Sequence, residues 1–219
     1  MVSTIAKPTQ IILSGEKRVT LRGLTWQNYQ QIITNLPQNR AAQLTYDCGT
    51  LEISMPLEDH ESSRCLIELF IRILVVELGM KMKTMGSTTL NREDLDRGSE
   101  PDNAYYIQNQ PKVAGKKVNL QEDPPPDLIV EVDITHTDID KNRLYASMGV
   151  PEFWRYNGQE LSIYQLGNEG YYIEIDNSPT FPIIEKSDLY RFLAEAALDE
   201  VEAELNFRQW VRKRLEEMP

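Results

Sequence analysis

Three acidic residues lie on one face of the most apolar strand that the sequence predicts, over residues 127–134. Side chains alternate between the two faces of a strand. Asp127, Glu131 and Asp133 therefore share one face with Ile129, while aliphatic side chains take the other. Buried carboxylates are tolerated where they are paired or bound to a metal. The strand thus predicts a place where carboxylates meet a cation.

A second pair of acids precedes this strand in the segment 100–104. Pro101 favours an extended conformation for Glu100, and in an extended chain Glu100 and Asp102 lie on the same side. If this segment and the strand are neighbours in a sheet, Asp102 faces Glu131. Two carboxylates at that separation form an oxygen-lined site that suits Mg²⁺ or Mn²⁺.

A lysine follows the strand, in the first turn of the helix predicted over residues 138–148. Asp138, Lys141 and Tyr145 share one face of that helix. Lys141 can reach back to the strand end, where it could orient or deprotonate a water or stabilise charge on a phosphate. The spacing also allows a plain ion pair between Lys141 and Asp138, with the strand acids solvated.

Hydrophobic periodicity and turn residues indicate the elements that position these groups. Thr25 is expected to cap a helix that Pro37 closes. The other expected elements are a hairpin at 44–55 with its turn at 47–49, a buried helix at 59–78, short strands within 81–107, a surface loop at 111–126, strands at 152–156, 161–166 and 171–175, and one or two helices within 186–218. This order predicts a mixed α/β domain with a central sheet and helices packed against it.

Histidine and cysteine offer weaker signals. His60 begins the buried helix and could contact a phosphate or the metal site, although a histidine there more often caps or packs. The set of Cys48, Cys65, His60 and His136 fits no standard zinc module, and Cys65 is interpreted as a core residue.

The composition bounds the class of protein. The chain has 219 residues and a net charge of −11, which weakens the case for nucleic-acid binding unless a local patch around a cation overrides that charge.

We expect a flexible arm at residues 1–18, one domain at 19–190 and a helical extension at 191–219 packed on it. Two cysteines without a signal peptide favour a cytoplasmic protein, and no segment predicts a membrane span. An apolar stripe around Trp210 is expected to be an intrachain contact or the seam of a homodimer.

The motifs together resemble the Uma-two family of restriction endonucleases. The resemblance is carried by residues 100–102, 126–133 and 140–154, joined by 46–56 and His60, within roughly residues 20–190. The family is similar to the PD-(D/E)xK nucleases. The resemblance therefore implies a restriction-endonuclease-like α/β fold, with a central mixed sheet flanked by helices, and Mg²⁺-dependent hydrolysis of phosphodiester bonds, expected first in DNA.

Carried over by position, the resemblance implies that Asp102 and Glu131 are the catalytic acids that hold the metal, with the carbonyl of Val132 as a third ligand. The sequence departs from the superfamily at the lysine, because Asp133 stands in its place. Lys141 is the candidate for a catalytic lysine that has moved to the helix. Accessory site residues are expected at positions His60, Glu100, Asp133 and Tyr145.

Two other classes of function compete with a working nuclease. A nuclease-derived fold kept as a binding or interaction module, without turnover, is favoured by the net charge and the displaced lysine. A two-carboxylate glycosidase would need acids across a sugar cleft, and the sequence gives no sign of an aromatic-lined cleft.

Overall fold

The computed structural model describes residues 16–37 and 39–217. The strands are β1 (Glu16–Arg22), β2 (Gln43–Asp47), β3 (Thr50–Pro56), β4 (Lys83–Thr84), β5 (Leu90–Arg92), β6 (Arg97–Ser99), β7 (Asn103–Tyr106), β8 (Leu128–Val132), β9 (Glu152–Tyr156), β10 (Leu161–Leu166) and β11 (Tyr172–Ile175). The helices are α1 (Trp26–Asn35), α2 (Glu58–Glu77), the 3₁₀ turn η1 (Glu93–Leu95), α3 (Gln110–Val113), α4 (Lys141–Ser147), α5 (Lys186–Ala196) and α6 (Glu200–Glu216).

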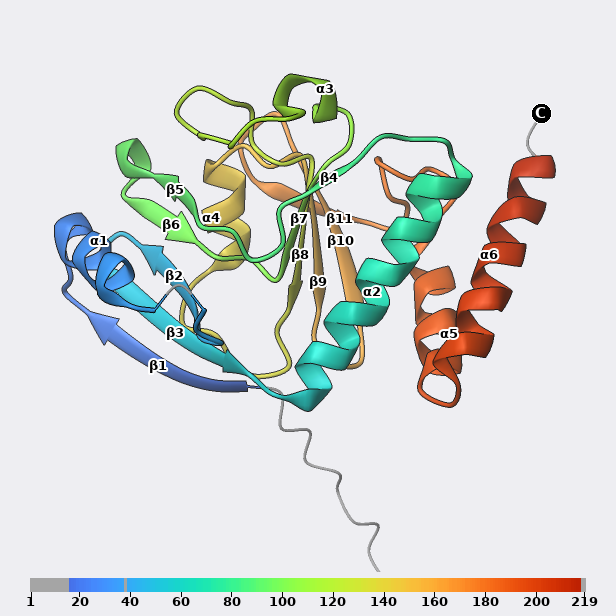
Figure 1. Cartoon of the computed structure of the whole chain (residues 1–219), viewed down its shortest axis with the longest axis horizontal. Coiled ribbons are helices and arrows are strands. Elements are labelled where there is room, and N and C mark those ends of the chain that lie inside the picture. Colours follow the sequence, from blue (N-terminus) through green and yellow to red (C-terminus); the bar gives the residue numbers. More distant parts are fainter. Residues whose placement is uncertain (1–15, 38, 218–219) are drawn as a thin grey trace, which may run out of the picture.

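Two sheets organise the molecule. A five-stranded sheet has the order β1-β3-β2-β6-β5, and a six-stranded sheet has the order β11-β10-β9-β8-β7-β4. In Figure 1 the smaller sheet and α1 lie on one side of the larger sheet, which α4 also covers, while α2, α5 and α6 lie on the other side. The α/β class with a mixed sheet flanked by helices is therefore confirmed, and the second sheet is a feature that the sequence did not indicate.

The smaller sheet is built on the predicted hairpin. Cys48 and Gly49, with φ of 44° and 94°, form its two-residue turn, and both lie in the left-handed region that a tight hairpin requires. β1 then adds to β3 as an antiparallel edge strand. Thr25 caps α1 as expected, and the side chain of Asn28 completes a reciprocal capping box.

The larger sheet brings the predicted acids together. β7 runs antiparallel to β8 with Asn103 opposite Val130, so one residue further along this register Asp102 lies opposite Glu131. β8 and β9 are parallel, and α4 lies in the crossover between them. The start of β7, the end of β8 and the start of α4 therefore meet at one corner of the sheet.

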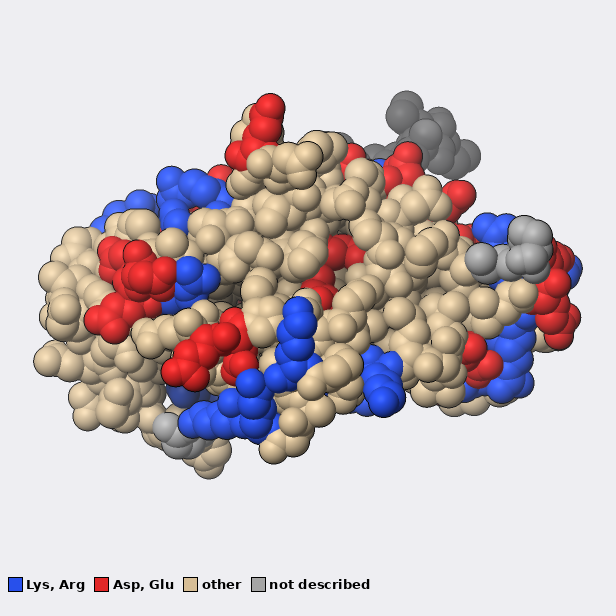
Figure 2. Space-filling model, turned by 90° about the horizontal axis from the view of Figure 1, so that it is seen from above, with Lys and Arg blue, Asp and Glu red and all other residues tan. Residues whose placement is uncertain are grey.

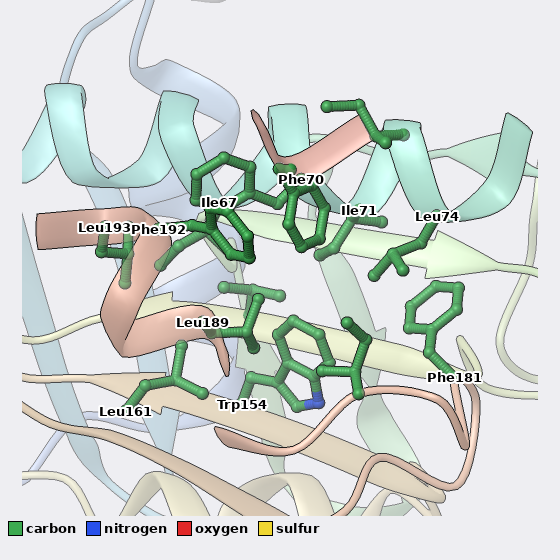
Figure 3. Packing of buried hydrophobic residues seen from close by; sticks show 14 of the residues in the cluster. Ile67, Phe70, Ile71, Leu74, Trp154, Leu161, Phe181, Leu189, Phe192 and Leu193 are labelled. Carbon is green, nitrogen blue, oxygen red and sulfur yellow. The ribbon is translucent and has the colours of Figure 1, made fainter. Parts of the chain in front are cut away.

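The predicted alternation along β8 is confirmed by its packing. Val130 and Val132 enter the main core beneath α2, and Ile129 enters a second core against α4. Figure 3 shows the side chains of Phe70 and Ile71 on α2 directed towards Trp154 of the sheet. The acids of β8 thus lie on the α4 side of the sheet.

The C-terminal helices close the main core. Phe207 on α6 is buried, with its ring centroid 4.7 Å from that of Phe70 and 4.8 Å from that of Phe192. The stripe around Trp210 is therefore an intrachain contact, and the homodimer stays a prediction. Within the part of the chain that the structure describes, no helix has the length and apolar character needed to cross a membrane.

Several boundaries differ from the sequence predictions. Of the expected arm at residues 1–18, residues 1–15 lie outside the described residues, and the last three begin β1. The segment 111–126 opens within α3 rather than as a loop, and α4 begins at Lys141 rather than at 138. Cys65 is exposed on α2, so its assignment to the core was wrong.

Candidate active site

Asp102 is the innermost acid of the site and is 2% exposed. Its Oδ2 accepts hydrogen bonds from the backbone N–H of Val132 at 2.7 Å and from Nε2 of His60 at 3.1 Å. Its Oδ1 is buried and has no hydrogen-bond partner among residues 16–37 and 39–217. A carboxylate held on one oxygen and bare on the other can accept a cation.

Glu131 lies opposite Asp102, and α4 supplies its partners. The Nζ of Lys141 donates to Oε2 of Glu131 at 2.9 Å and to Oδ1 of Asp133 at 2.8 Å. The hydroxyl of Tyr145 bonds to Oε1 of Glu131 and lies 2.8 Å from the hydroxyl of Ser99. These contacts confirm the prediction that the side chain of Lys141 reaches back to the end of the strand. Both carboxylate oxygens of Glu131 therefore have a hydrogen-bond partner.

A second ring of charges surrounds Asp133. Arg18 on β1 donates to its Oδ1 at 2.8 Å, and Arg155 on β9 donates to its Oδ2 at 3.0 Å. Arg18 also pairs with Glu16 and Glu52, so this one guanidinium links the edge of the smaller sheet to the end of β8. These partners position Asp133 as a structural anchor for Lys141.

The connected network holds more negative than positive charge. Its cations are Arg18, Lys141 and Arg155, and its acids are Glu16, Glu52, Glu131 and Asp133, an excess of one negative charge. Asp102 beside it adds a second negative charge, which a charged His60 would offset. Because uncompensated charge is expensive away from water, the network favours a further proton or a bound cation.

The pKa directions follow this imbalance. Burial raises the pKa of Glu131 to about 8; the charge of Lys141 opposes this shift, and the charges of Asp102 and Asp133 add to it. Burial alone would raise the pKa of Asp133, but Lys141, Arg155 and Arg18 hold it at about 2. Burial would also raise the pKa of Asp102, and the hydrogen bond and charge of His60 lower it.

The raised pKa of Glu131 predicts a pH-dependent stability. Because its folded-state pKa of about 8 exceeds the ordinary value of 4.5, the stabilisation that its proton provides is complete below about pH 4.5. That stabilisation is lost as the pH rises through about 8. We therefore expect the wild-type chain, in EDTA, to lose free energy of unfolding relative to Glu131→Gln between about pH 5 and pH 9. Urea denaturation at each pH measures this difference, and parallel pH profiles for the two chains would contradict it.

A cavity of about 470 Å³ opens onto Asp102. It is lined by Arg40, Arg64, Glu61, Glu100 and Asp102 together with backbone and small side chains from residues 41–43 and 86–87. Glu100 belongs to the wall of this cavity, where it accepts hydrogen bonds from the N–H of Leu44 at 2.9 Å and from Thr89 at 2.8 Å. The predicted accessory residue Glu100 therefore lies beside Asp102 but is tied to the smaller sheet.

Two carboxylates, Asp102 and Glu131, are the candidate ligands for a metal ion at this corner of the sheet. Among the described residues no three histidine, cysteine or acidic side chains form a metal-binding group. Mg²⁺ is ordinarily held by one or two carboxylates and keeps several waters. Asp102, through its bare Oδ1, and Glu131, whose oxygens Lys141 and Tyr145 engage, are two carboxylates that could hold such an ion.

Sequence reasoning brought out the centre of the site and missed its surroundings. The structure brings Asp102 and His60 into one hydrogen-bonded pair, and Glu131, Lys141 and Tyr145 into a second hydrogen-bonded group at the same corner of the sheet. Asp127 lies at the other end of β8, where it accepts from the backbone N–H groups of Ile107 and Asn109. The missed residues are Arg18, Arg155 and Ser99, and no motif or periodicity marks them in the sequence.

Comparison with known proteins gives a match to one family model. A model of the Uma2 family, described as "Putative restriction endonuclease", matches residues 26–196. The matched range contains Asp102, Glu131 and Lys141 and excludes Arg18. No curated protein matches the chain. The mixed sheet flanked by helices is the restriction-endonuclease-like α/β fold that the sequence predicted.

Proposed function

The chain belongs to the Uma2 family, and on that premise we propose that it is a Mg²⁺-dependent endonuclease that hydrolyses phosphodiester bonds, with DNA as its substrate. The observation that carries this proposal is the bare Oδ1 of Asp102 beside the buried pair of Glu131 and Lys141. A buried acceptor without a donor is expensive unless a ligand satisfies it. A divalent cation at this corner of the sheet would do so.

Asp102 and Glu131 would hold the ion, and the carbonyl of Val132 is the proposed third ligand. When bound, Mg²⁺ polarises a phosphate oxygen and lowers the pKa of a water. His60 fixes Asp102 by its hydrogen bond to Oδ2, so the other oxygen is directed to the ion. Val132 holds the same oxygen from the strand backbone.

The role of Lys141 is electrostatic. Burial would lower its pKa, but Asp133 and Glu131 outweigh burial and raise it above the ordinary value. A lysine with a raised pKa stays protonated at neutral pH, so Lys141 does not serve as a base. Its charge keeps Glu131 in place and helps to offset negative charge that develops on the phosphate.

Metal binding tests the proposal directly. In calorimetric titration with Mn²⁺ we expect the wild-type chain to bind and Asp102→Ala to lose at least a factor of roughly 10–100 in affinity. His60→Gln, which removes a partner of Asp102 but no proposed ligand, should fall between them. Equal Mn²⁺ binding by the wild type and Asp102→Ala would refute the site.

One observation favours the competing function of a binding module without turnover. Both oxygens of Glu131 are already occupied by Lys141 and Tyr145, so an ion must displace or share one of these contacts. If Mn²⁺ binding depends on Asp102 but the chain leaves plasmid DNA and duplex RNA uncleaved, the result would support the function of a binding module without turnover. Nicking that disappears in Glu131→Ala would exclude it, and nicking that persists would indicate a contaminating nuclease.

A further inference from the structure

The cavity in front of Asp102 carries two arginines from separate elements. Arg40 lies in the loop between α1 and β2, and Arg64 lies on α2. Both line the same cavity of about 470 Å³ as Asp102. Neither belongs to the buried network around Asp133, and the proposed chemistry does not use them.

Each arginine is held by an acid of the cavity wall. The Nε and one terminal nitrogen of Arg64 both donate to Oε2 of Glu61 at 3.1 Å. Arg40 pairs with Glu100, and its Nε is buried without a hydrogen-bond partner in the described part of the chain. The guanidinium groups are thus positioned before any substrate binds, and one of them has an unused donor.

The wall and the opening suit an extended strand. Residues 41–43 and 86–87 contribute two alanines, a glycine and a serine beside Gln43, so few bulky side chains obstruct the cavity. An opening of this kind can admit a backbone phosphate and one neighbouring sugar. The same cavity is lined by Asp102, so a phosphate in it would lie near that carboxylate.

We infer that Arg40 and Arg64 bind a phosphate of the substrate strand adjacent to the phosphate that is cleaved. This inference rests on the proposed function. Guanidinium groups bind phosphate through paired, charge-assisted hydrogen bonds, and such contacts fix the register of a nucleic-acid strand. Here the two arginines would place the scissile phosphodiester bond beside Asp102. Glu61 and Glu100 hold the guanidinium groups in position until a phosphate of the strand replaces them as the partner.

The charge of the whole chain makes local cations necessary. The net charge is −11, and Figure 2 shows groups of basic and of acidic side chains next to one another on the face that it presents. The net charge of the chain therefore opposes its attraction to a nucleic acid. Within the lining of the cavity, Arg40 and Arg64 are the cationic side chains that could meet a phosphate.

The test compares Arg64→Gln and Arg40→Gln with Arg72→Gln. Arg72 is the matched control because it also lies on α2 and pairs with Glu68, an acid that Arg64 contacts as well, but it is outside the lining of the cavity. The measurements are kcat and KM for a fluorescent 12-base-pair DNA duplex with Mn²⁺, and the affinity for that duplex with Ca²⁺ at several salt concentrations. Melting temperatures verify that each variant is folded.

We expect KM to rise roughly tenfold or more in Arg64→Gln, with kcat little changed. The slope of log affinity against log salt should fall by about one for each arginine removed. Arg64→Lys should recover part of the affinity, because charge returns without the paired hydrogen bonds. Arg72→Gln should match the wild type, and if Arg40→Gln does not fold, Arg64→Gln alone decides.

The outcomes separate the inference from the proposed function. If the wild type cleaves the duplex while Arg64→Gln keeps its KM and its salt slope, the phosphate site is refuted and the nuclease stands. If Arg72→Gln shows the same loss as Arg64→Gln, the effect is general electrostatics and the site is also refuted. If the wild type neither binds nor cleaves DNA or RNA duplexes, both ideas fail.

Discussion

Asp102→Asn will reduce plasmid nicking by roughly 10²–10³-fold in the presence of Mn²⁺. Asparagine keeps the size of the side chain and one carbonyl oxygen, so the hydrogen bond from Val132 can persist. It removes the negative charge that the proposed ion requires at Oδ1. Initial rates of conversion of supercoiled to open-circular plasmid, at matched protein concentration, measure the effect.

Asp127→Asn is the control for this prediction. Asp127 is also a buried aspartate beside β8, 4% exposed, but it bonds to Ile107 and Asn109 at the far end of the strand. It should retain nicking once its melting temperature shows that it is folded. Wild-type rates in Asp102→Asn would contradict the assignment of the catalytic acid.

Lys141→Met will lower the free energy of unfolding by about 3–5 kcal/mol at neutral pH. Lys141 is 5% exposed and is the shared partner of Glu131 and Asp133. Its removal takes one of three cations from the ionised carboxylate of Asp133 and a donor from Glu131, because methionine fills the volume but carries no charge. Urea denaturation monitored by tryptophan fluorescence measures the loss.

Lys186→Met is the matched control, since Lys186 also bonds to two acids but at the surface, with a side chain that is 27% exposed. It should cost less than about 1 kcal/mol. The double variant Lys141→Met with Glu131→Gln should recover part of the loss above about pH 8, where Glu131 would otherwise be ionised. A cost below about 1 kcal/mol for Lys141→Met would show that the buried pair is not what stabilises the corner of the sheet.

Local patterns in the sequence were sufficient to predict the elements that carry Asp102 and Glu131, the proposed catalytic acids. The alternation along β8 predicted the face on which Glu131 lies. The antiparallel register of β7 and β8 then places Asp102 opposite Glu131. Alternation does not say which end of a strand matters, so Asp127 was placed on the correct face yet belongs to a different cluster. The periodicity of α2 likewise predicted a buried helix, and His60 was close enough to its start to be considered.

The features that were missed depend on partners far apart in the chain. α4 was expected to start at Asp138, but the backbone N–H of Asp138 donates to Glu52 of β3, and Asp140 caps the helix instead. β1 exists because β3 offers it an edge, and a strand whose apolar residues Val19 and Leu21 stay exposed gives no signal of burial. Arg18 and Arg155 meet Asp133 only in the folded chain.

The ion pair between Arg18 and Asp133 also has a consequence for the order in which the chain folds during synthesis. The two residues are 115 positions apart, so at ribosomal rates of about 5–20 residues per second Asp133 emerges roughly 6–23 s after Arg18. During that interval Glu16 and Glu52, which are synthesised much nearer to Arg18, can hold its charge on the growing smaller sheet. The ion pairs of Arg18 with Glu16 and Glu52 can therefore form before Asp133 has been synthesised. The contact between Arg18 and Asp133 can form only after the end of β8 has left the ribosome.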